Sequence, residues 1–177
     1  MAKRKILTDG APELRAVCAP VKNITPRIRA ILDDMVETMR AADGVGLAGP
    51  QVGVLRRLVV VETEPGQVYK LINPEITASS GEQEGDEGCL SVPGKSGCVK
   101  RPMNVTVKAL DQDGNEITVE GSELLARCLC HEIDHLNGIL YTDVAIYMNE
   151  PEPEDEEEAS GDSGRQNGAP RKYGRGK

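Results

Sequence analysis

The order of the hydrophobic patterns along the chain constrains its fold more than any other feature. An amphipathic helical pattern near the N-terminus is followed by a block of strand patterns, and a second helical pattern comes only after that block. Strands that come in a block, without alternating helices, are typical of α+β proteins with mainly antiparallel sheet. We therefore expect an α+β fold in which antiparallel-rich sheets pack around a central second helix.

The first helix is predicted from about Pro26 to Ala42. Thr25 is suited to cap its N-terminus, and a proline is favoured at the first helical position. Apolar residues recur at helical spacing and give the helix one core face: Ile28, Ile31, Leu32, Met35, Val36 and Met39. Asp43-Gly44 ends this N-terminal amphipathic helix and opens a glycine-rich loop that reaches Gly53.

Strand patterns follow at residues 57–62, 68–72, 104–110 and 116–120. The tight-turn sequence Asp111-Gln-Asp-Gly114 joins the last two into a predicted hairpin. The second helix is predicted to start after Gly121, with Ser122 as its N-cap, and to run to Asn137. Gly138 then suits the first position beyond the helix.

Composition limits the partners of the chain. The 177 residues include 21 Lys+Arg and 29 Asp+Glu, for a net charge of −8, and no Phe or Trp. This balance disfavours nucleic-acid surfaces, which rely on phosphate contacts and stacked aromatic rings. No apolar run reaches the roughly 18 residues of a membrane span, and no secretory signal follows the basic start. We expect a cytoplasmic protein with no membrane and no specific nucleic-acid partner, and a monomer by default.

From Asn149 to Lys177 the sequence is first acidic, then rich in Gly, Ser, Asp and Asn, and finally basic. Such a segment cannot bury enough apolar area to offset its ordering entropy. We therefore predict one folded domain over residues 1–148 and a disordered tail over residues 149–177.

The chain has only two histidines, and both lie in the second helix, in His131-Glu132-Ile133-Asp134-His135. Residues four apart share a helix face, so both imidazoles can bind one divalent metal. Glu132 is placed to handle a proton on metal-bound water. The structural alternative is a chance pairing on a solvated helix face.

Two residues are candidates for a third ligand. Cys89 lies in Glu87-Gly-Cys-Leu-Ser91, which we predict to be a loop, and a thiolate is a strong soft ligand. Glu154 lies downstream in the acidic segment, where almost any spacing would find a carboxylate. A lone cysteine is also often a small buried hydrophobe. The odd count of five cysteines favours free thiols or a metal ligand over a disulfide framework.

Three segments resemble the peptide deformylase family in order and spacing: Gly44-Val-Gly-Leu-Ala-Gly-Pro-Gln51, Glu87-Gly-Cys-Leu-Ser91 and His131-Glu-Ile-Asp-His135. The resemblance covers roughly Ile6 to Val144, so it implies a deformylase-like catalytic domain within residues 1–148. It implies a hydrolase that removes the formyl group from N-formylmethionine of newly made polypeptides and releases formate. One divalent metal would be held by Cys89, His131 and His135. The resemblance points to Fe²⁺, and Zn²⁺, Ni²⁺ or Co²⁺ also suit these donors.

The same resemblance implies roles for other residues. Metal-bound water attacks the formyl carbon, and Glu132 takes its proton and returns it to the leaving amine. The side chain of Gln51 and the backbone N–H of Leu90 stabilise the oxyanion. Gly46 is the expected site of close backbone approach to the substrate, although the glycines could simply turn the chain.

Helical geometry suggests a pocket beside the histidines. Cys128, Arg127 and Leu124 lie three, four and seven residues before His131, so they point toward the metal side. Leu124 and Cys128 are expected to line an apolar pocket sized for methionine, with Val45 opposite. Ordinary core packing is an equal alternative for Leu124. Cys130 faces away, so it cannot form a zinc pair with Cys128, and like Cys18 and Cys98 it receives no role.

Two alternatives stay open beside the deformylase. One is a metalloprotease that uses His131, His135 and Glu154, and the other is a non-catalytic relative that binds partners through its fold and charged tail. Nascent formylmethionyl peptides as substrates imply work near the ribosome. The acidic run that begins the tail would be repelled by ribosomal RNA, which leaves the docking mode open.

Overall fold

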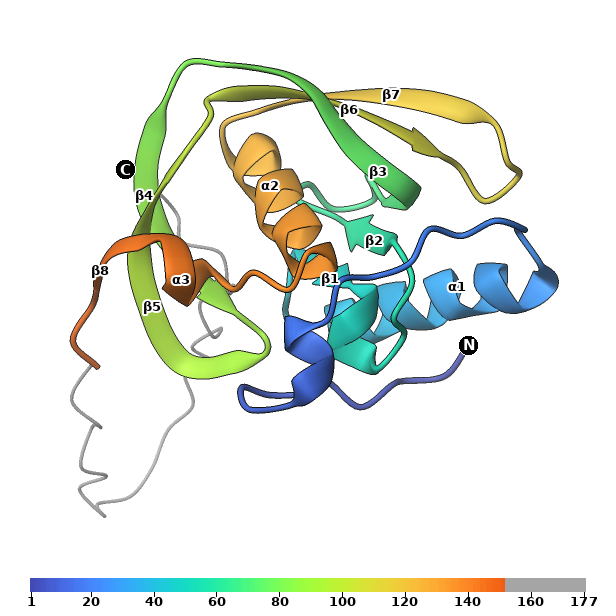
Figure 1. Cartoon of the computed structure of the whole chain (residues 1–177), viewed down its shortest axis with the longest axis horizontal. Helices are drawn as coiled ribbons and strands as arrows, with labels where there is room; N and C mark the ends of the chain where they lie inside the picture. Colours follow the sequence, from blue (N-terminus) through green and yellow to red (C-terminus); the bar gives the residue numbers. More distant parts are fainter. Residues whose placement is uncertain (152–177) are drawn as a thin grey trace, which may run out of the picture.

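The computed structural model describes residues 1–151. Two antiparallel sheets lie on either side of the central helix α2, as Figure 1 shows, and this arrangement confirms the expected α+β class. The elements in chain order are η1 (Pro12–Arg15), α1 (Pro26–Ala41), β1 (Gly46–Ala48), η2 (Gly49–Val52), β2 (Leu58–Val61), β3 (Tyr69–Ser80), β4 (Gln83–Cys89), β5 (Val92–Arg101), β6 (Asn104–Leu110), β7 (Glu116–Ser122), α2 (Leu124–Leu136), α3 (Tyr141–Val144) and β8 (Ala145–Met148).

The larger sheet has the strand order β1-β2-β3-β6-β7, and the smaller has the order β4-β5-β8. All pairings within the two sheets are antiparallel. The predicted hairpin is confirmed, because β6 and β7 pair from Leu110↔Glu116 to Asn104↔Ser122. The smaller sheet was not predicted: β4 is polar and glycine-rich, so it lacks the alternation by which strands are identified.

Helix α1 begins as the capping pattern predicts. The Thr25 hydroxyl accepts a hydrogen bond from the backbone N–H of Ile28 at 3.3 Å, and Pro26 occupies the first turn. The helix ends at Ala41, one residue before the expected end. Its apolar face packs on the larger sheet, where it contributes Ile31, Leu32, Met35, Val36 and Met39 to a cluster with Leu47, Leu58 and Val60.

Helix α2 starts differently from the prediction, and it ends at Leu136, one residue before the expected end. Ser122 is not its N-cap: this residue ends β7, and Glu123 precedes the helix with a positive φ of 54° and no capping bond from its side chain. At the other end Gly138 has a φ of 74°. Its N–H donates to the carbonyl of His135, and the N–H of Ile139 donates to that of Asp134. These two bonds close the last turn in the manner expected of a glycine end.

Buried apolar side chains form three clusters, which lie around α2, beneath α1 and beside the smaller sheet. The first joins α2 to the larger sheet and includes Leu129 and Leu136. The second, beneath α1, reaches Leu90. The third contains Cys89 and Tyr141 and packs against β5 and the start of α3. The first cluster thereby holds the central helix against the larger sheet.

Within residues 1–151 the structure contains no helix that is both long and apolar enough to cross a membrane. Residues 152–177, which include Glu154 and most of the predicted tail, lie outside the described residues.

Candidate metal centre

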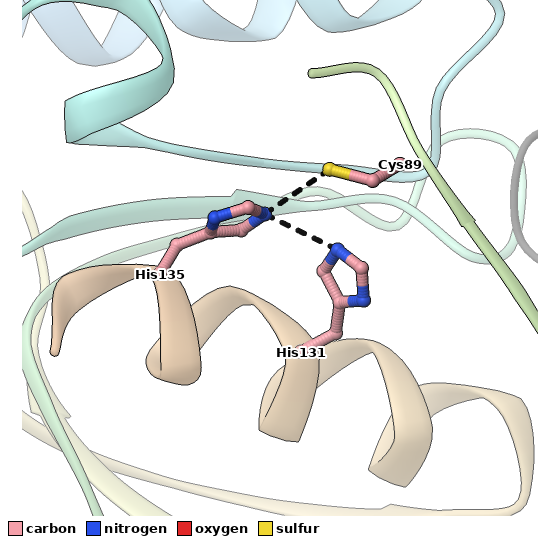
Figure 2. Close-up of side chains that lie close together, drawn as sticks. All are labelled: Cys89, His131 and His135. Atoms are coloured by element: carbon pink, nitrogen blue, oxygen red, sulfur yellow. Dashed lines mark hydrogen bonds between the residues drawn. The ribbon is translucent and has the colours of Figure 1, made fainter. Parts of the chain in front are cut away.

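Three side chains that sequence reasoning singled out converge beside α2. The Nε2 atom of His135 lies 3.3 Å from the Sγ of Cys89 and 3.2 Å from the Nε2 of His131. Figure 2 shows the two imidazoles rising from the helix toward the sulfur. All three residues are buried, and their ligand atoms lie within 4.8 Å of one another. Cys89 is not in a loop as predicted: it is the last residue of β4.

The donor set fits a divalent metal. One sulfur and two imidazole nitrogens suit Zn²⁺, Fe²⁺, Ni²⁺ or Co²⁺. Two nitrogens bound to one tetrahedral metal lie about 3.3 Å apart, close to the separation of the two Nε2 atoms. Neither Cys128 nor Cys130 belongs to this cluster within residues 1–151, and all five cysteines are buried.

Glu87 on β4 fixes the first histidine. Its Oε2 lies 2.8 Å from the Nδ1 of His131, and its carboxylate also accepts bonds from Arg101 at 2.8 and 3.1 Å and from Arg127 at 2.9 Å. Burial raises the pKa of Glu87, but the hydrogen bonds from His131 and Arg101 outweigh it and lower the pKa to about 2. Because a charged carboxylate can only accept, His131 must donate from Nδ1, and its Nε2 is the atom that can bind a metal.

Arg127 points toward the metal side of α2, as its spacing predicts, but it contacts Glu87 and not a ligand. Its Nη1 also donates to the carbonyl oxygens of Gly85 at 3.1 Å and Val99 at 3.0 Å, and so joins the helix to the smaller sheet. Arg101, which sequence reasoning missed, spans Glu87 and Asp134, whose Oδ2 accepts a bond of 2.6 Å. The sequence did offer one indication of such a partner, because a glutamate that is buried within this motif needs a nearby cation to balance its charge.

Gln51 on η2 presents its amide nitrogen to the centre. Its Oε1 accepts a bond of 2.9 Å from the backbone N–H of Ala48, which leaves the Nε2 to face Ser91 and Cys89. The Nε2 donates to the Ser91 hydroxyl at 3.1 Å and lies 3.5 Å from the Cys89 sulfur. The backbone N–H of Ser91, a residue that sequence reasoning missed, points to the same sulfur at 3.4 Å. Leu90 lies between these residues, in the two-residue turn that joins β4 to β5.

Glu132 is buried against the glycine-rich segment. A Cβ added to Gly46 would overlap its Oε1 and would lie 2.9 Å from the Cys128 sulfur. This segment is not a plain loop: Gly46 belongs to β1, and η2 follows it. The Cys128 sulfur lies 3.6 Å from the carbonyl oxygen of Val45, so these predicted pocket residues are neighbours. Leu124 is half-buried and packs against the apolar cluster between α2 and the larger sheet, to which Val45 and Cys128 belong. The use of these residues for substrate binding stays a prediction.

Tyr141, which sequence reasoning also missed as a neighbour of the site, stacks on the face of His131. The ring centroids are 6.0 Å apart and the planes meet at 21°. Burial raises the pKa of Tyr141 to about 12. The imidazole of His131 is therefore held at its Nδ1 by Glu87 and on one ring face by Tyr141.

The chain is similar to known proteins over nearly all of the described residues. A sequence model of the polypeptide deformylase family matches residues 3–151. A peptide deformylase of Acetivibrio thermocellus is 57% identical over 155 residues, which cover 87% of this chain and 91% of that protein. One of Agathobacter rectalis is 55% identical over 143 residues, which cover 81% of this chain and 90% of that protein.

Solved structures agree with this similarity. A crystal structure of a peptide deformylase from Legionella pneumophila superposes with a TM-score of 0.79 at 46% identity, and covers 81% of this chain and 86% of that one. That of the enzyme from Ehrlichia chaffeensis, in complex with actinonin, gives a TM-score of 0.80 at 39% identity, with 81% and 89% covered. The chain therefore belongs to the polypeptide deformylase family of enzymes.

Proposed function

We propose that the enzyme removes the formyl group from N-formylmethionine at the start of newly made polypeptides and releases formate. The observation that carries the proposal is the convergence of Cys89, His131 and His135 beside the carboxylate of Glu132 and the amide of Gln51. Family membership supports the same reaction, because the relatives are peptide deformylases.

Cys89, His131 and His135 would hold one divalent metal. We propose Fe²⁺, which the family resemblance implies, while Zn²⁺, Ni²⁺ and Co²⁺ suit the same donors. When bound, the metal acts as a Lewis acid and makes water a nucleophile near neutral pH.

The protein's own groups then handle the proton and the developing charge. Glu132 accepts a proton from the attacking water as the new C–O bond forms at the formyl carbon. The Nε2 of Gln51 and the backbone N–H of Leu90 donate to the resulting oxyanion. Glu132 returns the proton to the amine nitrogen as the C–N bond breaks, so the products are formate and a free methionyl N-terminus.

The methionine side chain would lie among Val45, Gly46, Leu124 and Cys128. These residues come from the β1 segment and from the N-terminal half of α2, next to Glu132. A carbon-lined wall with one thiol suits an unbranched thioether, since both are apolar and polarizable. We further propose that the enzyme works as a monomer in the cytoplasm and meets its substrates near the ribosome. The catalytic domain would comprise residues 1–148.

The test is formate release from formyl-Met-Ala-Ser by protein loaded with Fe²⁺ without oxygen, or with Ni²⁺. Glu132→Gln keeps the shape of the side chain but removes the proton acceptor, so we expect turnover to fall by about 10²–10⁴-fold. Bound metal, measured on the same sample, should not change. Absence of turnover from fully loaded protein, beside an active control enzyme, would refute the proposal.

A further inference from the structure

The segment before α1 makes backbone hydrogen bonds to three separate parts of the candidate centre. The N–H of Leu7 donates to the carbonyl of Gln51 at 2.7 Å, and the N–H of Asp9 donates to that of Ser91 at 2.7 Å. The N–H of Cys18 donates to the carbonyl of Leu136 at 2.9 Å. These acceptors lie in η2, in the β4–β5 turn and at the end of α2. In Figure 1 the short helix η1 of the same segment, drawn in blue, lies below α2.

Side chains of the same segment enter all three core clusters. Ile6 packs against the cluster beneath α1, which contains Leu90. Leu14 is 1% exposed and belongs to the cluster of Cys89 and Tyr141. Cys18 belongs to the cluster between α2 and the larger sheet. One short segment therefore contacts each of the parts from which the site is built.

These contacts matter because the candidate site is assembled from separate elements. The histidines come from α2, Cys89 from the smaller sheet, and Gln51 from η2 beside the larger one. Leu7 and Asp9 are two residues apart, so in extended chain their N–H groups point the same way and can bind neighbouring acceptors. Their acceptors belong to residues whose side chains meet, since Gln51 donates to the Ser91 hydroxyl.

We propose that residues 6–18, the N-terminal strap, position the oxyanion donor Gln51 and the ligand Cys89 relative to α2. The proposal rests on the proposed function of the site. Leu7 holds the backbone of Gln51, and Asp9 holds Ser91, whose own N–H faces the Cys89 sulfur. Leu7 and Asp9 are positioning residues, because they act only through other groups.

Proline substitution tests the two bonds separately, because proline has no N–H. Asp9→Pro should speed release of Ni²⁺ to a chelator by about tenfold, since the turn beside a ligand is freed. Leu7→Pro should lower kcat by about tenfold with Ni²⁺ release unchanged, since it displaces the oxyanion donor. Thr8→Pro is the matched control, because the Thr8 N–H donates to no described residue, and it should behave as the parent.

A merely structural role would change both readouts together, in step with the folding midpoint. That result, or equality of both variants with Thr8→Pro, would overturn the proposal. If the parent releases no formate, the proposed function fails, while chelator release still tests the strap.

Hydrogen exchange tests the strap in the unmodified protein, should the variants not fold. If the strap holds a metal ligand, metal binding must in turn hold the strap. Loading with Ni²⁺ should slow exchange of the Leu7 and Asp9 amides by about tenfold. The Arg4 amide, which donates to Thr38 on α1 at 2.8 Å, is the control and should not change. Equal effects on all three amides would contradict the proposal.

Discussion

At the scale of single residues, the centre depends on a buried carboxylate that is not one of the candidate ligands. Glu87 is fully buried and meets two guanidinium groups and one imidazole. Asp134 completes the arrangement by accepting from Arg101. Two negative and two positive side chains balance one another, so the network leaves no net charge to be buried beside the ligands.

Glu87→Gln should destabilise the fold and weaken metal binding. The substitution leaves Arg101 and Arg127 buried with too little negative charge, which costs about 3 kcal/mol of unfolding free energy. Loss of the acceptor for His131 should weaken metal affinity by about 10–100-fold. Urea unfolding and metal titration measure the two effects. Glu82→Gln is the control: its pair with Lys100 is exposed, so we expect no measurable change in the free energy of unfolding.

The lowered pKa of Glu87 predicts a pH dependence of stability. Its carboxyl titrates at about 2 in the fold, against an ordinary value of 4.5, so it stabilises the folded state above pH 4.5. This contribution is lost as the pH falls from about 4.5 to about 2. Urea unfolding of metal-free protein at several pH values measures it. The difference in unfolding free energy between the parent and Glu87→Gln should become smaller as the pH falls through this range. A constant difference would contradict the assignment of this pH dependence to Glu87.

At the scale of elements, β1 and α2 lie so close that a Cβ at position 46 would meet side chains of α2. Gly46→Ala should displace the Glu132 carboxylate, since an added Cβ would overlap it. We expect kcat for formate release to fall by about tenfold, with bound metal unchanged.

Gly121→Ala is a control for this substitution, because its Cβ would meet aliphatic carbons of Leu129 and Leu125 on the same helix. It should alter stability more than kcat. Equal losses of kcat in the two variants would show that general packing, and not the Glu132 carboxylate, is responsible.

Elements with a local signal could be predicted from the sequence, and the smaller sheet of β4, β5 and β8 could not. Thr25 and the helical spacing located α1, Gly138 located the end of α2, and the turn at residues 111–114 located the β6–β7 hairpin. Strand β4 gave no signal because its stability comes from pairing with β5. Cys89 was consequently expected in a loop, although it ends that strand.

The same contrast holds within the site. His131 and His135 share a helix face, so their meeting follows from spacing alone. Cys89 was assigned as a ligand from the family resemblance, and the structure brings it to them. Arg101 and Ser91 reach the centre only through the pairing of β4 with β5, which no local pattern encodes.

At the scale of the whole molecule, the three candidate ligands and the region matched by the family all lie before residue 152. A chain that ends at Pro151 should therefore keep its bound metal and release formate within about twofold of the parent rate. Cys89→Ala should lose the metal. Metal analysis of both proteins checks this, and the reverse pattern would support a metalloprotease that uses Glu154.

The strap also has a consequence for the order in which the chain can reach its native contacts. Leu7, Asp9 and Cys18 bond to Gln51, Ser91 and Leu136, so one short segment has partners spread over most of the described chain. Contacts of such long sequence separation form late, because closing a long loop costs entropy before any bond rewards it. On a translating ribosome, the strap can therefore complete its contacts only after α2 has been made, because Cys18 bonds to Leu136 at the end of that helix.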